Sequence, residues 1–262
     1  MGIDLKKAED QAKKSFIVRL EKEVQETGVT HDIMAQLKLT LDISGSMNDP
    51  GMSGRLYDNG TVNLFVSRFY GAARVLDDDG DMEVFPHSNV CEKLKVPVDI
   101  NNYKNYVEQE IMKKMKSYYF SGTKYAPMIK AVVADLHPTL PQLAICIVDG
   151  DCHDPGNTRN ELIKSANTPT FFLYIGIGKN VREFKFLSSL YDTPQSTPKG
   201  GLLNNLFRKK NTPSNIREQR KVDNFAFYYI QDIMALTDEE LYNICADKFI
   251  SWYYYAKEKG IF

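Results

Sequence analysis

The chain has 262 residues, of which 43% are hydrophobic, enough apolar sequence to bury the core of one large domain. Its net charge of −1 gives no reason to expect a nucleic-acid partner, and no apolar run approaches the roughly 18 residues that a membrane-spanning helix needs. The first residues lack the apolar stretch of a signal peptide, and the four cysteines are scattered without a C-x-x-C pair. We therefore expect a cytoplasmic protein without a transmembrane segment.

The spacing of apolar residues predicts alternating helices and strands along most of the chain. In chain order we expect a helix over 4–26, a strand over 36–42, a helix over 61–77, a strand over 82–85, an edge strand over 90–99, helices over 103–117 and 126–136, a strand over 143–149, a helix over 156–167, a strand over 169–177, a helix over 181–190, a strand over 225–230 and a last helix that begins at the capping box Thr237–Glu240. This alternation predicts an α/β fold with a mostly parallel central sheet and helices on both faces.

The distribution of charge suggests how the domain is divided. We expect residues 1–34 to be a helical extension packed on a domain that spans 35–262. The stretch 193–221 contains three prolines and seven Lys or Arg residues against a single Glu. We interpret it as a mobile basic insertion on the surface, since it has too few large apolar residues to offset the entropy of ordering it.

The run Leu41-Asp-Ile-Ser-Gly-Ser46 is the most informative motif. It places the side chains of Asp42, Ser44 and Ser46 at alternate positions just past the end of a buried strand. Open α/β sheets bind ligands outside the carboxyl ends of their strands, and carboxylate and hydroxyl oxygens are hard ligands that suit Mg²⁺.

Two further segments strengthen this interpretation. Thr123 follows Ser121-Gly122 before a predicted helix, and Asp149 ends the most apolar strand of the chain. Asp42 and Thr123, taken singly, could each simply cap a turn or a helix. The three segments together favour a metal site formed by Asp42, Ser44, Ser46, Thr123 and Asp149, which would bind Mg²⁺ or, alternatively, Mn²⁺ or Ca²⁺.

With these segments in this order, the chain resembles von Willebrand factor A (vWA) domains, whose divalent-cation site is the metal-ion-dependent adhesion site, or MIDAS. It is similar in particular to the vWA domain of the bacterial tellurium-resistance and stress-response proteins. This resemblance rests on Gly122–Pro127, Phe172–Gly178, Val222–Asn224 and Thr237–Tyr242, and extends over residues 35–262. The chain departs from the family pattern at Lys124 and Asp151, which bear on metal affinity and partner choice.

The resemblance implies a Rossmann-like vWA fold with a MIDAS at the carboxyl edge of the sheet. It also implies a metal-dependent protein-interaction module in a tellurite-resistance or stress-response system, with a protein partner that supplies an Asp or Glu carboxylate to the metal. We expect no enzyme, because no general base with a convincing partner lies near the site. Two alternatives stay open: a metal-dependent hydrolase, for which His153 is the one nearby imidazole, and an intracellular divalent-metal sensor.

Overall fold

The computed structural model describes residues 3–27, 33–51, 54–77, 79–117, 119–178, 180–190, 220–232 and 235–262. Apart from its last two positions, the predicted basic insertion at 193–221 lies outside the described residues. The expectation that this insertion is mobile therefore stays a prediction.

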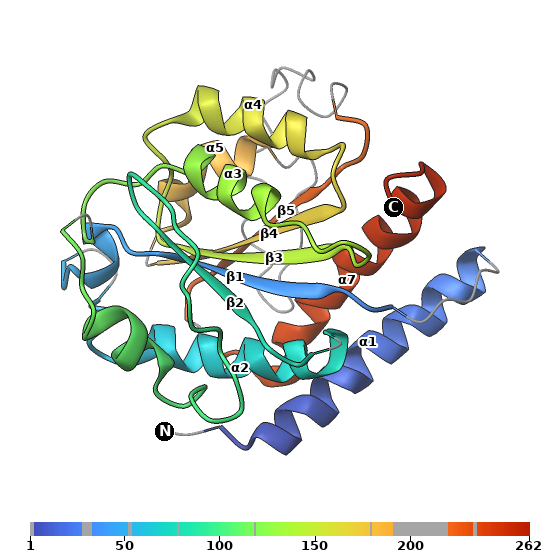
Figure 1. Ribbon diagram of the computed structural model, residues 1–262, viewed down its shortest axis with the longest axis horizontal. Coiled ribbons are helices and arrows are strands. Elements are labelled where there is room, and N and C mark those ends of the chain that lie inside the picture. The colour runs from blue at the N-terminus through green and yellow to red at the C-terminus, as the bar shows by residue number, and fades with distance from the viewer. Residues whose placement is uncertain are drawn as a thin grey trace.

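Five parallel strands form the central sheet, in the order β2-β1-β3-β4-β5 (Figure 1). Their bounds are β1 Gln36–Asp42, β2 Glu83–His87, β3 Gln142–Val148, β4 Thr170–Ile177 and β5 Phe225–Ile230. All seven residues of β3 and all eight of β4 are buried, as expected where helices cover both faces of a parallel sheet. The predicted α/β fold with a mostly parallel sheet is confirmed.

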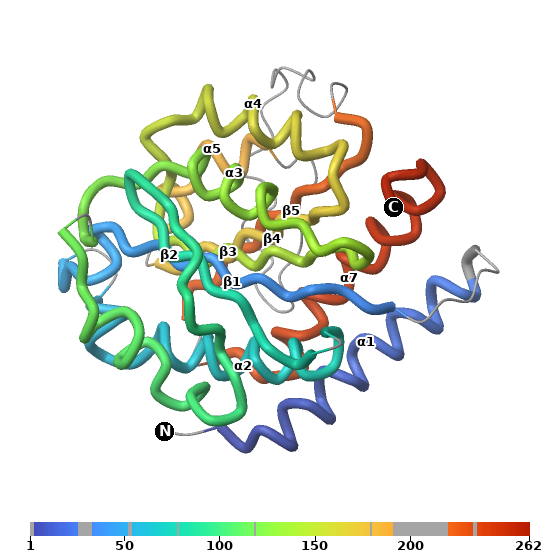
Figure 2. Tube along the Cα trace, in the orientation of Figure 1, coloured from blue at the N-terminus to red at the C-terminus, as the bar shows by residue number. Residues whose placement is uncertain are grey.

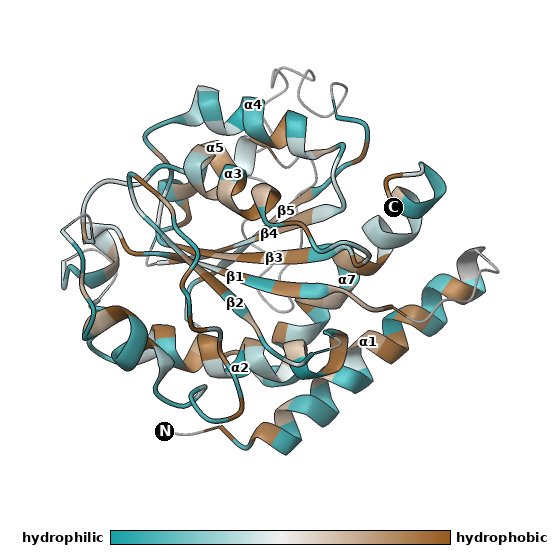
Figure 3. Ribbon diagram, viewed as in Figure 1, coloured by the Kyte–Doolittle hydropathy of each residue, from teal (hydrophilic) through white to brown (hydrophobic). Residues whose placement is uncertain are grey.

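Two layers of helices cover the sheet (Figures 1 and 3). One layer contains α1 Leu5–Thr27, α2 Thr61–Leu76 and α7 Asp238–Glu258, and the other contains α3 Ala126–Ala134, α4 Pro155–Ser165 and α5 Lys185–Leu190. Side chains alternate along a strand, so Leu39 and Leu41 of β1 join the core under the first layer. The residues on the other side of β1, including Lys38 and Asp42, therefore face the layer of α3 and α4.

Helix α1 packs closely on α2 and α7. Ala8, Ala12 and Phe16, spaced by four, are all buried in the core that these helices share. At the crossing with α2, a Cβ atom on Gly71 would lie 2.9 Å from the Tyr242 hydroxyl oxygen and 3.0 Å from Ala8 Cβ. Glycine is therefore required at position 71 by the close approach of the neighbouring helices.

Two predicted elements between β2 and α3 are wrong. Residues 90–99 form no strand but run along the outer side of β2, as the trace in Figure 2 shows, with isolated bridges Met82↔Val98 and His87↔Cys91. Pro86 in β2 and Pro97, next to the Met82↔Val98 bridge, both lack the N–H that a continuous ladder needs.

The predicted helix over 103–117 shortens to a single wide turn, Val107–Met112, in which the Lys113 N–H donates to Glu108 O. Val107 and Ile111 are buried, whereas all described side chains from Lys113 to Ser117 are exposed, so no apolar face remains to stabilise further turns. The predicted helix over 181–190 divides into a short 3₁₀ segment, Val181–Phe184, and α5.

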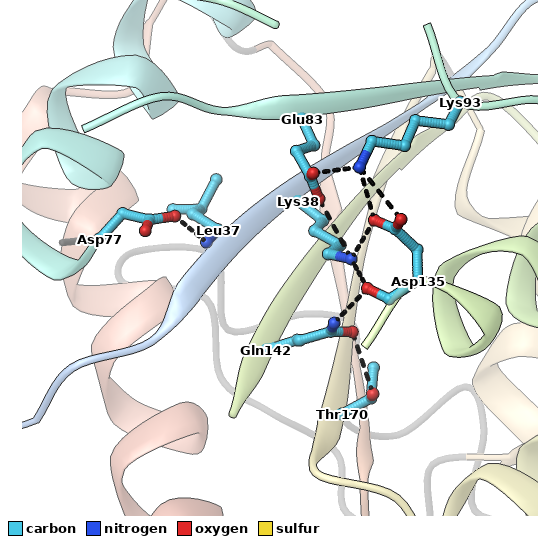
Figure 4. Close-up of polar contacts among 8 residues, drawn as sticks. All are labelled: Leu37, Lys38, Asp77, Glu83, Lys93, Asp135, Gln142 and Thr170. Carbon is cyan, nitrogen blue, oxygen red and sulfur yellow. Dashed lines mark hydrogen bonds and ion pairs between the residues drawn. The ribbon is translucent and has the colours of Figure 1, made fainter. Parts of the chain in front are cut away.

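A network of charged side chains lies at the amino end of the sheet (Figure 4). Lys38 is fully buried, and its Nζ lies 2.6 Å from Asp135 Oδ2 and 3.1 Å from Glu83 Oε2. Lys93 contacts the same two carboxylates from the solvent side. Burial alone would raise the pKa of Asp135, but hydrogen bonds from Lys38 and Lys93 lower it to about 2. The network ties β1 to β2 and to the end of α3.

Candidate metal centre

The candidate site lies at the opposite, carboxyl edge of the sheet, on the left of Figure 1. From β1 the chain passes through α2 to β2 on one side and then returns to β3 on the other side of β1. The strand order reverses between β1 and β3, and open α/β sheets bind ligands at such a switch point. Asp42 is the last residue of β1, and Asp149 directly follows β3.

Asp42 is fully buried at the end of β1. Its Oδ1 accepts a hydrogen bond from the Ser44 N–H at 2.7 Å, which shapes the tight turn after the strand. Among the described residues, its Oδ2 has no hydrogen-bond partner. A buried carboxylate oxygen without a donor is costly, and Asp42 lies at the same edge of the sheet as Ser44 and Ser46.

A chain of hydroxyl groups joins the first loop to Asp149. The Ser44 and Ser46 Oγ atoms are 2.9 Å apart, and Ser46 Oγ donates to Asp149 Oδ1 at 2.9 Å. Because the single hydroxyl proton of Ser46 goes to Asp149, Ser44 is the donor in the first of these bonds. The structure therefore brings four of the five predicted ligands, Asp42, Ser44, Ser46 and Asp149, into one hydrogen-bonded group.

Thr123 is 7% exposed and joins this group through the backbone of its loop. The Gly45 N–H donates to Ser121 O at 3.0 Å, and the His153 N–H donates to Thr123 O at 2.8 Å. The loop is also held to the end of β2, because the Lys124 N–H donates to Ser88 O. These bonds bring the three predicted ligand loops side by side.

Burial makes both carboxylates reluctant to ionise. Desolvation, together with the nearby charge of Asp149, raises the pKa of Asp42 to about 8. Desolvation also raises the pKa of Asp149 to about 6, against a hydrogen bond from Ser46 that lowers it. Two acids that resist carrying negative charge side by side would gain from a cation placed between them.

The side chains present suit a hard divalent cation. They offer two carboxylates, one with an unpartnered buried oxygen, and hydroxyl oxygens whose lone pairs can be shared with an ion. Among the described residues, no group of three or more His, Cys, Asp and Glu side chains is placed to hold a metal. A cation here would depend on Ser and Thr oxygens, a donor set that favours Mg²⁺ over soft or imidazole-seeking metals.

The acidic residues after β3 have structural roles that the sequence analysis did not identify. The Asp151 carboxylate accepts hydrogen bonds from the Phe186 and Leu187 N–H groups and so holds the start of α5. Asp154 accepts from the Tyr125 N–H at 3.0 Å and from the Ala126 N–H at 3.2 Å, at the start of α3. Asp154 directly before Pro155 marks the start of α4, but nothing in the sequence indicates that its side chain instead accepts from the N–H groups at the start of α3.

Two aromatic residues near Asp42 were missed entirely. The Tyr57 hydroxyl donates to the Asp42 backbone carbonyl at 2.8 Å. His87 is the register partner of Asp42 on β2; it is fully buried, and burial lowers its pKa to about 3. No pattern of spacing in the sequence marks either residue, since the Tyr57 contact depends on how the loop after β1 folds back and the His87 contact depends on how β2 pairs with β1.

The fold, with its switch point at β1 and β3, is that of a vWA domain. Two of the solved structures that match this chain illustrate it. An aerotolerance-related membrane protein from Bacteroides fragilis NCTC 9343 matches 83% of this chain and 99% of its own, with a TM-score of 0.51 and 14% identity. The conserved hypothetical protein BatB from Bacteroides thetaiotaomicron matches 80% of this chain and 96% of its own, with a TM-score of 0.50 and 12% identity. Likeness at these identities concerns the fold alone.

Sequence comparison gives the particular family. The model of the vWA domain found in the TerF C terminus matches residues 34–198. The uncharacterized protein YcbR of Bacillus subtilis (strain 168) is 32% identical over 256 residues, which covers 96% of this chain and 89% of the relative. The chain therefore belongs to the vWA-TerF-like family, the vWA domain proteins of the tellurium-resistance group. In the part of the chain that the structure describes, no helix is both long and apolar enough to cross a membrane.

Proposed function

We propose that this vWA domain is a divalent-cation-dependent docking module for protein partners. Asp42, Ser44, Ser46, Thr123 and Asp149 would hold the cation, and Mg²⁺ suits their oxygen atoms best. The observation that carries the proposal is the unpartnered buried Oδ2 of Asp42, at the switch point and in the same hydrogen-bonded group as Asp149.

The cation would supply an electrophilic contact for the partner. Two carboxylates neutralise a divalent ion, and neutral hydroxyl ligands leave it able to attract a further anionic oxygen. An Asp or Glu side chain of a partner protein meets that requirement. Membership of the family supports a role in tellurite resistance or the stress response, and the four unpaired cysteines favour a cytoplasmic location.

We place docking ahead of hydrolysis because the acids that follow Asp149 in the sequence already have backbone partners. Asp151 and Asp154, which follow Asp149 in the sequence, accept hydrogen bonds from backbone N–H groups at the starts of α5 and α3. Neither is free to serve as the general base that a hydrolase would need.

Calorimetric titration with Mg²⁺ tests the proposal. The wild type should bind the ion, and Asp42→Ala should abolish binding because it removes one of the two buried carboxylates. Asp58→Ala is the matched control, since Asp58 is an exposed acid in the same connection between β1 and α2. Equal Mg²⁺ binding by the wild type and Asp42→Ala would exclude the assigned site.

A further inference from the structure

We infer that Tyr57 and Phe120 are positioning residues that fix the Thr123 loop against the Asp42 loop before any cation binds. The inference rests on the proposed function, because it concerns how the same site is assembled. Neither residue carries a candidate ligand atom in its side chain. Tyr57 contacts the backbone of the ligand Asp42, and Phe120 contacts the backbone of Ile43, which lies between the ligands Asp42 and Ser44.

Phe120 has an unusual backbone conformation for a bulky residue. Its φ is +59°, in the left-handed region that large side chains rarely adopt. Such strain persists only where surrounding contacts hold it, and it gathers at functional sites. Here Phe120 lies three residues before Thr123, directly at the start of the second ligand loop.

The left-handed turn at Phe120 aims its backbone at the first ligand loop. The Phe120 N–H donates to Ile43 O, and the carbonyl oxygen of the following residue, Ser121, accepts from the Gly45 N–H. A Cβ atom on Gly45 would lie 2.9 Å from Phe120 O, so only glycine permits this approach. The backbones of the two loops therefore interlock between Asp42 and Ser46.

Tyr57 supplies the side-chain contact that holds this arrangement. Tyr57 is 5% exposed, and its ring meets the Phe120 ring edge to face, with centroids 6.0 Å apart. Its hydroxyl donates to Asp42 O at 2.8 Å. A single side chain thus contacts the backbone of the first carboxylate ligand and the ring of the residue that orients the second loop.

This arrangement makes the site rigid in the absence of the ion. Loops commonly move more easily than strand ends, but this loop is bonded to the β1 end, the β2 end and the third loop at once. Thr123 should therefore keep its place relative to Asp42 whether or not a cation is present. Pre-positioned ligands raise affinity because less order has to be created on binding.

Three variants test the inference. Tyr57→Phe removes only the hydrogen bond to Asp42 O. Phe120→Ala removes the ring, but alanine is still strained at the positive φ of this position. Phe120→Gly removes the ring and the strain together. The matched control is Tyr242→Phe, since the Tyr242 hydroxyl also donates to a buried backbone carbonyl, Arg68 O, at 2.7 Å, but in the contact between α7 and α2.

Two readouts are compared: Mg²⁺ affinity by calorimetry, and amide hydrogen exchange of Gly45 and Phe120 in the metal-free protein. Tyr57→Phe and Phe120→Ala should each weaken Mg²⁺ binding by about tenfold, as for other residues that orient metal ligands. Phe120→Ala should also speed exchange at both amides more than Phe120→Gly does. Tyr242→Phe should change neither readout.

Wild-type exchange rates and wild-type Mg²⁺ affinity in Phe120→Ala and Tyr57→Phe would overturn the inference. If the wild type binds no Mg²⁺, the proposed function fails, while the exchange rates in the metal-free protein still decide whether these two residues hold the loops together. The two ideas can therefore be rejected separately.

Discussion

Asp42 has a carboxylate that the metal-free fold does not fully satisfy. One oxygen accepts the Ser44 N–H, and the other has no donor among the described residues. Burial raises its pKa to about 8, so the folded state binds a proton at Asp42 more tightly than the unfolded state does. This contribution to stability is fully present below the unfolded pKa of 3.8 and is lost as the pH rises through about 8.

Asp42→Asn should remove this loss, because an amide cannot ionise. In the metal-free wild type, the free energy of unfolding should fall by about 1–2 kcal/mol between about pH 6.5 and about pH 8.5, from about 1.4 kcal/mol for each pH unit of the shift. In Asp42→Asn the fall should be shallower, and added Mg²⁺ should give no stabilisation. Chemical denaturation at the two pH values, with and without Mg²⁺, measures both effects.

This pH window lies above the pKa values of the neighbouring Asp149 and His87. Burial raises the pKa of Asp149 only to about 6. Burial also lowers the pKa of His87 to about 3, so the contribution of His87 to the free energy of unfolding changes only below the ordinary histidine pKa of about 6.5. Parallel pH profiles for wild type and Asp42→Asn would show that Asp42 is already ionised in the metal-free protein.

Among the individual residues of the site, the sequence predicted the candidate ligands but not the residues that support them. Asp42, Ser44 and Ser46 could be placed at one edge because alternation along a strand and a short turn fix their relative positions. Tyr57 and Phe120 could not, since a left-handed φ and an edge-to-face ring contact depend on how two distant loops meet.

Among the elements, β1 is unusual because one of its buried side chains is a lysine. Lys38 is fully buried, and its charge is compensated by Glu83 from β2 and Asp135 from the end of α3 (Figure 4). Removing one partner of a buried ion pair leaves the other charges uncompensated, which costs more than the pair itself contributes.

Lys38→Met should lower the free energy of unfolding by about 3 kcal/mol, the low end of the range for breaking a buried pair. The low end applies because Lys93 and solvent still reach the two carboxylates. Lys93→Met is the control: Lys93 is 40% exposed in the same network, so its loss should cost about 1 kcal/mol or less. Equal losses in urea denaturation would show that burial does not govern this network.

The sequence predicted the strands of the sheet well, because apolar runs of five to eight residues rich in β-branched and aromatic side chains and flanked by polar turns are typical of buried parallel strands. It failed at 90–99 and 103–117, where tertiary contacts decide the outcome. Pro86 and Pro97 interrupt one ladder, and beyond Met112 the second segment has no apolar side to bury.

At the scale of the whole molecule, α1 raises the question of where the domain begins. The family model starts at residue 34, after α1 has ended. Yet Ala8, Ala12 and Phe16 lie in the same apolar core as α2, α7 and one face of the sheet. Contacts between charged groups add to this packing, since Lys14 faces Glu239, and Arg19 faces Asp247, on α7. We propose that α1 belongs to the cooperative folding unit even though it precedes the matched region.

Phe16 and Ile17 allow a direct test, because they are neighbours on α1 with opposite surroundings. Phe16 is 3% exposed and Ile17 is 41% exposed. Phe16→Ala should cost about 3 kcal/mol, as in other buried Phe→Ala changes, and lower the melting temperature by about 6–12 °C while the protein still unfolds in one transition. Ile17→Ala should stay within about 0.5 kcal/mol of the wild type, as surface substitutions do. Calorimetric scans of both variants measure this. A small effect of Phe16→Ala, or a separate early transition that it alone shifts, would mean that α1 folds as an appendage and that the vWA unit is complete without it.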